Sequence, residues 1–256
     1  MAAFHLSKWY LDCVTDAGEV SILYTGKLRW GAIRLNYSSR LEAGKNAISE
    51  RHSFRAVQQP SVSGDSLTWK CKPLRLDCEW KSGSGELRET IFASADGDIS
   101  WHCQIPGAVC RISEHTGWGY AEHLEMTIPP WKLPIRTLRW GRFISCRESV
   151  VWIDCRGEFA RTLVYRNGVP ARVRSIGDGR IDFEDGSQLD LDRSLAIREG
   201  PLGLAPFSRA PGIRGSLPGR LLAITECKWR SRGRLLESHG PAAEGWAIHE
   251  RVEWPE

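Results

Sequence analysis

The stretch VSILYTGKLRWGAIRLNY, residues 20–37, carries the pattern that decides the fold. Apolar side chains recur there at alternate positions in short runs, and the first run passes through Thr25-Gly26. A period of two is typical of a strand with one buried face, and short runs of this kind between turn residues predict β-hairpins. Stretches with a helical period are nearly absent from the rest of the chain. The sequence therefore predicts an all-β protein.

Further strands are expected on both sides of the middle of the chain. Alternation and turn residues place them at 54–58, 67–72, 76–80, 86–92 and 99–104, and then at 149–154, 160–165, 169–176, 221–230 and 246–254. About eight strands fall in each half, which is enough for one small barrel apiece. We therefore expect two barrel-like domains, residues 1–116 and 117–256, joined around 117–143.

One segment breaks the alternation. Residues 199–219 hold four Pro and five Gly among several apolar side chains. Long loops of this kind are disordered or functional, and the apolar content favours a lid or plug.

The composition narrows the function classes. The chain of 256 residues contains 12 Trp but only 2 Met. An indole ring combines a large apolar surface with one N–H donor, so many Trp suit the wall of an apolar cavity as well as ordinary core packing. The net charge of +4 is small and the cations are spread among acids, which argues against a nucleic-acid interface. No apolar run approaches the roughly 20 residues of a membrane helix, so we expect no membrane span.

The eight cysteines are expected to be reduced thiols, mostly buried in strands. The first residues show no basic segment followed by an apolar one, so no secretory signal is visible and we expect a cytoplasmic protein. The sequence contains no C-x-x-C pair and no pair of histidines with metal-motif spacing. Gly-rich phosphate loops are absent too. We therefore expect no metal site and no cofactor.

The middle of the chain resembles a known family. It reads GWGYAEHLEMTI at 117–128, PPWKLP at 129–134 and LRWGRF at 138–143. Together with VWID at 151–154 and GWAIHERVEW at 245–254, these segments resemble the lipocalin-like family that includes the hydroxyneurosporene synthase (carotenoid hydratase) and AttH proteins. The similarity covers the second half well and the first half mainly in its strand rhythm.

The resemblance implies two lipocalin-like β-barrels side by side, with a ligand cavity in or between them. Members of the family act on large apolar substrates. Their activities include hydration of a carotenoid double bond, and proteins with a similar fold are linked to terpenoid cyclisation and to cycloaddition.

Glu122 is the strongest candidate for a catalytic acid. On a strand over 117–128, alternate side chains share a face. One face then carries Trp118, Tyr120, Glu122, Leu124 and Met126, and the other carries Ala121, His123, Glu125 and Thr127. A carboxyl group among aromatic rings keeps its proton to higher pH and can give it to an alkene or an epoxide. Trp118, Tyr120 and Trp140 would stabilise the resulting carbocation through their π faces.

Two alternatives stay open for this segment. Glu122 could instead form a structural ion pair with Arg139 or Arg142. His123 is a candidate substrate-binding residue, but it lies on the opposite strand face, so only one of the two can line a given cavity. A lone strand histidine is more often a satisfied or surface side chain.

Asp154 is the second candidate acid. It falls in phase with Val150 and Trp152 on an otherwise apolar strand, which would point it inward next to a substrate-binding Trp152. The alternative is an aspartate that caps the turn before residues 155–157.

The last strand offers a further set of candidates. Glu250 shares a strand face with Trp246 and Trp254, and we assign Trp246 and Glu250 to substrate binding. Glu226 is in phase with Lys228, and for it a cross-strand Glu–Lys pair is the simpler interpretation.

These observations predict an enzyme of isoprenoid, lipid or related natural-product metabolism that needs no cofactor. An apolar polyene or cyclisable small molecule would be hydrated or cyclised, with Glu122 or Asp154 as the acid. One rival is a non-catalytic lipocalin-like carrier of a fatty acid or isoprenoid. Another is a pericyclase that promotes cycloaddition by shape alone. The oligomeric state is left open.

Overall fold

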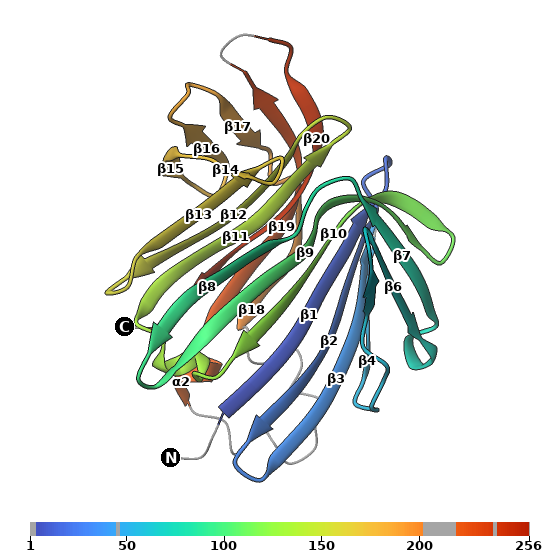
Figure 1. Ribbon diagram of the computed structural model, residues 1–256, viewed down its shortest axis with the longest axis vertical. Helices are drawn as coiled ribbons and strands as arrows, with labels where there is room; N and C mark the ends of the chain where they lie inside the picture. Colours follow the sequence, from blue (N-terminus) through green and yellow to red (C-terminus); the bar gives the residue numbers. More distant parts are fainter. Residues whose placement is uncertain (1–3, 45–46, 202–218, 238–239, 256) are drawn as a thin grey trace. The chain divides into compact units, whose positions relative to one another are not determined.

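The chain folds into two separate β units. The structure is a computed structural model that describes residues 4–44, 47–201, 219–237 and 240–255. The two compact units are Met1–Pro129 and Pro130–Glu256, drawn from blue to green and from green to red in Figure 1. The division falls inside the expected joint 117–143 but after the expected boundary at 116, because residues 117–126 pair within the first sheet.

The first unit is one antiparallel sheet of ten strands. The strands are β1 Phe4–Val14, β2 Val20–Trp30, β3 Ile33–Ala43, β4 Ile48–Ser53, β5 Ser61–Ser63, β6 Ser66–Cys71, β7 Leu76–Ser82, β8 Leu87–Ser94, β9 Gly97–Ile112 and β10 His115–Met126, with the short turn η1 Lys72–Leu74 before β7. Their order is β4-β3-β2-β1-β10-β9-β7-β6-β5, and β8 pairs with β9. The hairpin predicted from residues 20–37 is confirmed, since β2 and β3 pair from Trp30 and Ile33 outward.

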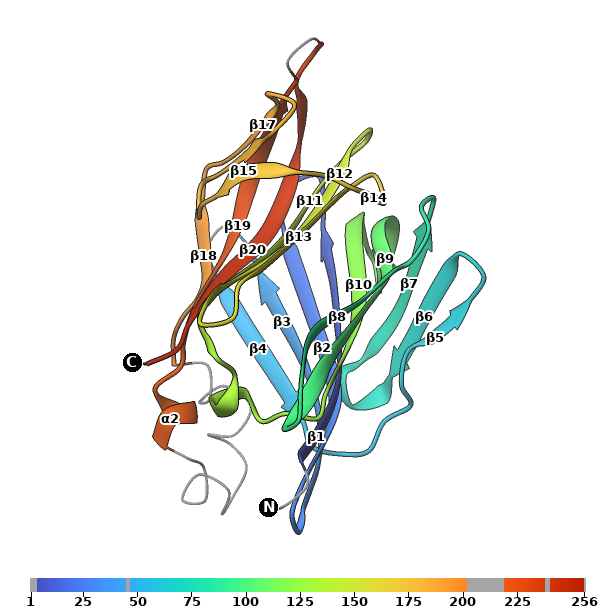
Figure 2. The same ribbon diagram turned by 60° about the vertical axis from the view of Figure 1, so that its left-hand side comes forward.

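The second unit is also one antiparallel sheet of ten strands, visible in Figure 2. The strands are β11 Ile135–Ser145, β12 Ser149–Gly157, β13 Arg161–Arg166, β14 Val169–Pro170, β15 Val173–Ile176, β16 Arg180–Phe183, β17 Gln188–Leu191, β18 Leu195–Pro201, β19 Thr225–Leu236 and β20 Ala243–Glu253, with η2 Pro130–Lys132 and the short helix α2 Gly219–Leu222. Their order is β14-β13-β12-β11-β20-β19-β17-β16-β15, and β18 pairs with β19.

The two sheets have the same topology. Adding ten to each strand number of the first order reproduces the second, including the off-path pairing of β8 with β9 and of β18 with β19. Each order is an open path with free ends, so each described sheet is a curled half-barrel and not a closed barrel. Ten strands in each unit replace the roughly eight that the turn spacing suggested.

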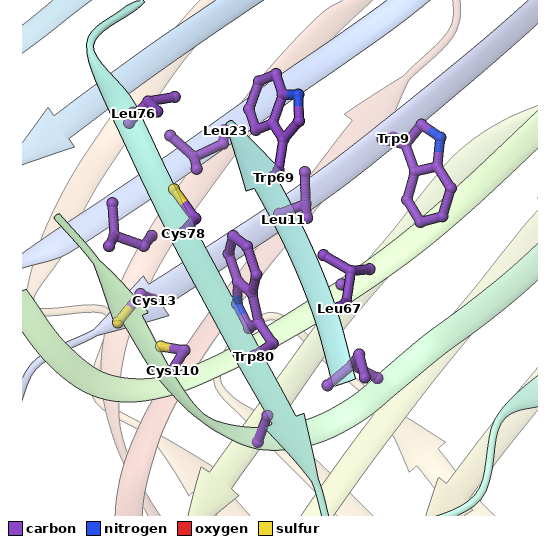
Figure 3. Packing of buried hydrophobic residues seen from close by; sticks show 14 of the residues in the cluster. Trp9, Leu11, Cys13, Leu23, Leu67, Trp69, Leu76, Cys78, Trp80 and Cys110 are labelled. Atoms are coloured by element: carbon purple, nitrogen blue, oxygen red, sulfur yellow. The ribbon is translucent and has the colours of Figure 1, made fainter. Parts of the chain in front are cut away.

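Each unit has its own apolar core. In the first unit, the core combines Trp9 and Leu11 of β1 with Leu67 and Trp69 of β6 and with Trp80 (Figure 3). Because β10, β9 and β7 separate β1 from β6 in the sheet, these residues can meet only where the sheet curls. The core therefore defines the concave face of the sheet, and we call the opposite side the outer face.

The second core is built in the same way. It combines Phe143 of β11 and Trp152 of β12 with Ile181 and Phe183 of β16 and with Ala247 of β20. The four tryptophans of these two clusters, Trp9, Trp69, Trp80 and Trp152, pack in the cores. Core packing was one of the two uses expected for the many tryptophans, the other being the wall of a cavity.

Three expected strands differ in the structure. The range 169–176 is divided into β14, which pairs with β13, and β15, which pairs with β16. Residues 54–58 are not a strand: their backbone carbonyl at Gln58 accepts a hydrogen bond of 2.8 Å from the Trp69 indole. The range 221–230 begins in α2, and β19 starts only at Thr225. Leu221 of α2 and Ile224, which follows the helix, pack with Val252. The lid expected at 199–219 lies largely outside the described residues, because the structure describes only 199–201 and 219 of it.

Candidate functional site

Strand alternation places Glu122 on the outer face of the first sheet. Ala121 belongs to the core on the concave face, so its neighbours Tyr120 and Glu122 face the other way. Both are nevertheless buried: Tyr120 is 0% exposed and Glu122 is 7% exposed. The sequence prediction that these two side chains share a face is confirmed by their contact.

Cross-strand pairing gathers polar and aromatic groups around Glu122. On β1, Tyr10 lies opposite Glu122 and Asp12 lies opposite Tyr120, and directly opposite residues share one face. On β9, Cys103 lies opposite Glu122. We call the buried set of Tyr10, Asp12, Trp101, Cys103, Tyr120 and Glu122 the Glu122 cluster.

Two donors converge on one oxygen of Glu122. The Tyr120 hydroxyl donates to Oε2 at 2.7 Å, and the indole N–H of Trp101 donates to the same atom. An oxygen that accepts two hydrogen bonds has no room for a proton of its own. When Glu122 is a carboxylic acid, its proton therefore sits on Oε1.

Two neighbours of Glu122, Tyr120 and Cys103, stay neutral at ordinary pH. Burial raises the pKa of Tyr120 well above its usual value, and the nearby Cys103 and Glu122 add to the effect. Burial also raises the pKa of the Cys103 thiol. Tyr120 therefore keeps its O–H as a donor, and Cys103 is a poor nucleophile.

Aromatic faces lie beside the carboxyl groups. The Tyr10 ring is 5.3 Å from the Tyr24 ring and 6.1 Å from the Tyr120 ring, both edge to face. The Tyr10 hydroxyl donates to Asp12 Oδ2 at 3.0 Å. Electron-rich rings next to an acid suit a reaction that forms a positive charge on carbon.

A local irregularity fixes the position of Glu122. The pairing of β9 with β10 shifts register between Gly119 and Ala121 and again between Ala121 and Glu122. Such bulges re-aim side chains. At the same level the Trp80 indole of β7 donates to the carbonyl of Asp12 at 2.8 Å, which ties β7 to β1.

His123 lies on the concave face, as its position in the alternation predicts. Its Nε2 is 2.8 Å from Ser7 Oγ, and its ring stacks on Trp9 at 4.7 Å. Burial lowers its pKa. The histidine therefore belongs to a different environment from Glu122.

Asp154, the second candidate acid, is held by cations. Arg156 contacts it at 2.7 Å, the Thr162 hydroxyl donates to it at 2.7 Å, and Arg139 lies 3.9 Å away. The turn-capping interpretation is wrong, because β12 continues through Asp154 to Gly157. These contacts suit a structural carboxylate better than a proton donor.

The other predicted residues divide between the two units. Trp118 is half-buried and shares the strand face of Glu122. Trp152 packs in the second core, and Trp140 lies opposite Glu250 on β11 and β20. Trp246 lies under the guanidinium of Arg230.

Glu250 belongs to a buried ion cluster. It pairs with Lys228, which also contacts Glu226 at 3.0 Å. The Glu–Lys pair expected for Glu226 forms, but along β19 and not across strands: the cross-strand partner of Glu226 is Val252, and that of Lys228 is Glu250.

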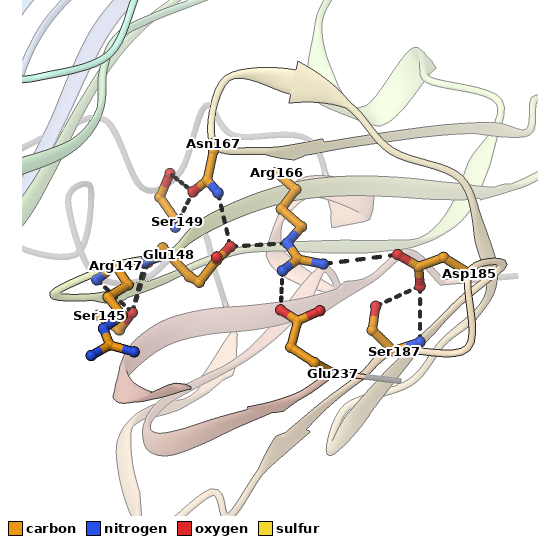
Figure 4. Close-up of polar contacts among 9 residues, drawn as sticks. All are labelled: Ser145, Arg147, Glu148, Ser149, Arg166, Asn167, Asp185, Ser187 and Glu237. Carbon is orange, nitrogen blue, oxygen red and sulfur yellow. Dashed lines mark hydrogen bonds and ion pairs between the residues drawn. The ribbon is translucent and has the colours of Figure 1, made fainter. Parts of the chain in front are cut away.

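An open pocket of about 530 Å³ in the second unit offers a weaker candidate. Arg166 on its lining binds Glu148 at 2.9 Å, Asp185 at 3.8 Å and also Glu237 (Figure 4). These ion pairs join β13 to three turns of the unit. The cluster thus has a structural role that accounts for its charges.

Sequence reasoning missed Asp12, Tyr10, Trp101 and Cys103. The strand at 99–104 was expected, and its alternation puts Trp101 and Cys103 on one face. Their meeting with Glu122 depends on the pairing of β1 and β9 with β10, which no local pattern specifies.

The described ranges offer neither a metal site nor a membrane-spanning helix. No group of three or more His, Cys, Asp or Glu side chains there has a geometry that could hold a metal ion. Within these same residues, no helix has the length and apolar character needed to cross a membrane.

Comparisons with known proteins agree with the architecture. No family model matches the chain, and no curated protein matches its sequence. Among solved structures, CghA matches with a TM-score of 0.57 and 12% identity over 98% of this chain and 88% of its own. An AttH protein (NE1406) from Nitrosomonas europaea gives 0.53 and 8% over 96% and 92%. Kievitone hydratase from Nectria haematococca gives 0.53 and 9% over 97% and 88%. The chain therefore has the fold of these structures, an AttH protein among them, which agrees with the fold that the resemblance of its central motif implied.

Proposed function

We propose that this protein is a cofactor-independent enzyme that hydrates or cyclises an apolar small molecule, with Glu122 as the general acid. The observation that carries the proposal is the buried Glu122 carboxyl, fixed by Trp101 and Tyr120 beside the rings of Tyr10 and Tyr24. A buried carboxyl group beside aromatic rings supports a role in donating a proton to a carbon–carbon double bond.

The reaction follows from the placement of the proton. Glu122 Oε1 gives its proton to one alkene carbon, so the O–H bond breaks as the C–H bond forms. The positive charge on the second carbon is stabilised by the π faces of the neighbouring tyrosines. Water then forms the new C–O bond and releases a proton, or a second double bond of the substrate closes a ring.

The structural relatives support this class of reaction. One of them is named kievitone hydratase, and CghA has also been crystallised with Sch210972. An apolar small molecule is therefore the substrate class we propose here.

The test is product analysis with a matched pair of variants. Purified protein is incubated with kievitone, farnesol, geranylgeraniol and lycopene, and products are analysed for an added water or a new ring. Glu122→Gln is expected to reduce the rate about 10²- to 10⁴-fold, the usual contribution of a general acid. Glu125→Gln is the control, because Glu125 is exposed and lies on the opposite face of the same strand.

The outcomes separate the rival functions. A protein that binds these compounds and converts none of them is a carrier, which contradicts the proposal. A cyclic product whose rate is unchanged in Glu122→Gln points to catalysis by shape and contradicts the role of the acid.

A further inference from the structure

The Glu122 cluster contains a second carboxyl group. Asp12 is 0% exposed, and the Tyr10 hydroxyl donates to its Oδ2 at 3.0 Å. The Trp80 indole binds the backbone carbonyl of the same residue, so the position of Asp12 is fixed through both its side chain and its main chain.

Asp12 and Glu122 are diagonal neighbours on one face. Asp12 lies opposite Tyr120, two residues from Glu122 on β10. Diagonal neighbours in an antiparallel pair are about 7–8 Å apart. Both carboxyl groups also affect Cys103. Burial is the main cause that raises the pKa of its thiol, and the charges of Glu122 and Asp12 raise this pKa further.

The two carboxyl groups alternate with two tyrosines on the paired strands, so that each acid lies opposite a tyrosine. Tyr10 faces Glu122 across the strands but donates to Asp12, while Tyr120 faces Asp12 but donates to Glu122. Each carboxyl group is thus oriented by a phenol of its own strand. Among the described residues of β1, β2, β9 and β10, Asp12 is the one other carboxyl group on this face.

A hydration needs both an acid and a base. After Glu122 has given its proton to the alkene, the attacking water must lose one as its oxygen bonds to carbon. Pairs of carboxyl groups that divide these two tasks stand about 6.5–9.5 Å apart where a water molecule fits between them. Asp12 and Glu122 are two buried carboxyl groups at diagonal positions on one strand face, which is an arrangement that can serve such a pair.

We propose that Asp12 is the catalytic base of the site and accepts the proton of the attacking water. The inference rests on the proposed function of Glu122. One water O–H bond breaks as the C–O bond forms, and the proton passes to the Asp12 carboxylate. Solvent water then carries a proton from Asp12 to Glu122, which restores both groups for the next turnover.

The first test measures the two proton transfers separately. Geranylgeraniol and kievitone are incubated with wild type and variants in heavy water. Asp12→Asn is expected to lower water addition about 10²- to 10⁴-fold, while recovered substrate still gains deuterium from Glu122. Glu122→Gln is expected to lose both, and Asp77→Asn, a half-exposed aspartate on β7, is expected to lose neither.

The outcomes distinguish the two proposals. Water addition at the wild-type rate in Asp12→Asn overturns the base and leaves the acid intact. Unchanged chemistry in Glu122→Gln, or no conversion of any probe by wild type, overturns the proposed function itself.

A second measurement needs no substrate and covers the case of inactive protein. The proposed roles require that Glu122 carries a proton and that Asp12 is ionised before the reaction. The infrared spectrum is expected to show a carboxylic-acid band that Glu122→Gln removes and Asp12→Asn keeps. A band removed by Asp12→Asn instead would reverse the roles and overturn the inference.

A third variant guards against loss of folding in Asp12→Asn. Tyr10→Phe removes one hydrogen bond to Asp12 and leaves the carboxyl group in place. Water addition is expected to fall about 10- to 100-fold with deuterium exchange retained. An unchanged rate of water addition in Tyr10→Phe contradicts the oriented base.

Discussion

At the scale of single residues, Gly119 shows how tightly the core of the first unit packs against the strand that carries Glu122. A side-chain carbon at this position would lie 2.5 Å from the Asp12 carbonyl, 2.6 Å from the Trp80 indole nitrogen and 2.7 Å from Cys110 Sγ. These distances are far shorter than a normal contact, and two of the three atoms anchor the strand that carries Asp12. The absence of a side chain is therefore required at this position.

We predict that Gly119→Ala destabilises the first unit. The free energy of unfolding should fall by roughly 1–3 kcal/mol, the usual cost of overpacking a core. Urea unfolding followed by tryptophan fluorescence measures it. Gly83→Ala is the control, since nothing lies within 4 Å of a side chain there, and a fall of the same size in both variants would contradict the packing argument.

His249 gives a residue-scale prediction about pH. Burial lowers its pKa to about 4, and its Nε2 lies 2.8 Å from Ser231 Oγ. Between pH 6.5 and 4, His249 binds a proton in the unfolded chain but not in the folded protein. The free energy of unfolding must therefore fall as the pH falls through this window. The shift corresponds to about 3 kcal/mol.

Unfolding measured from pH 7 to pH 4 tests this contribution. His249→Gln should flatten the loss of stability on acidification, whereas His115→Gln, at an exposed position, should leave it unchanged. An equal slope in wild type and His249→Gln would show that the histidine does not control it.

At the scale of elements, alternation along β10 predicted much of the site. It placed Tyr120 and Glu122 on one face and His123 on the other, and the structure has this arrangement. It did not predict Asp12 or Trp101, because their proximity to Glu122 arises from the register of β1 and β9 with β10. That register includes bulges at Gly119–Glu122, which a local sequence pattern does not specify.

Strands β19 and β20 carry a buried ion cluster on which we make a stability prediction. Burial opposes ionisation of Glu226, but Lys228 and Arg198 outweigh it and lower its pKa below the usual value. Lys228→Met would leave Glu226 and Glu250 without their shared cation. The free energy of unfolding should then fall by about 3–5 kcal/mol.

The matched control for this prediction is Lys81→Met. Lys81 contacts Glu79 at 3.3 Å but is 66% exposed, and exposed pairs contribute at most about 1 kcal/mol. Thermal unfolding of both variants decides the matter. Equal losses in the two would mean that the buried cluster does not depend on its charge balance.

At the scale of the whole molecule, the sequence predicted two similar β units but neither their strand number nor their openness. The ten-strand order of the first unit recurs in the second. Strand order depends on long-range pairing and not on local alternation, so the sequence pattern did not predict this repeat. The open paths also follow from long-range pairing, which turn spacing does not report.

The two units share their architecture but differ in the polar residues that they bury. Both units have an apolar core on the concave face, whereas the buried acid fixed by Trp101 and Tyr120 occurs on the outer face of the first. Function in this fold is thus a property of a few side chains placed on a repeated scaffold.

The most direct test of the account is mass spectrometry of products formed in heavy water. Wild type should convert an alkene of the panel to a product that carries one deuterium on the carbon next to the new hydroxyl group or ring bond. Glu122→Gln should give almost none of this product, and Glu125→Gln should match wild type. Deuterated product formed by Glu122→Gln at the wild-type rate would contradict the assignment of Glu122 as the acid.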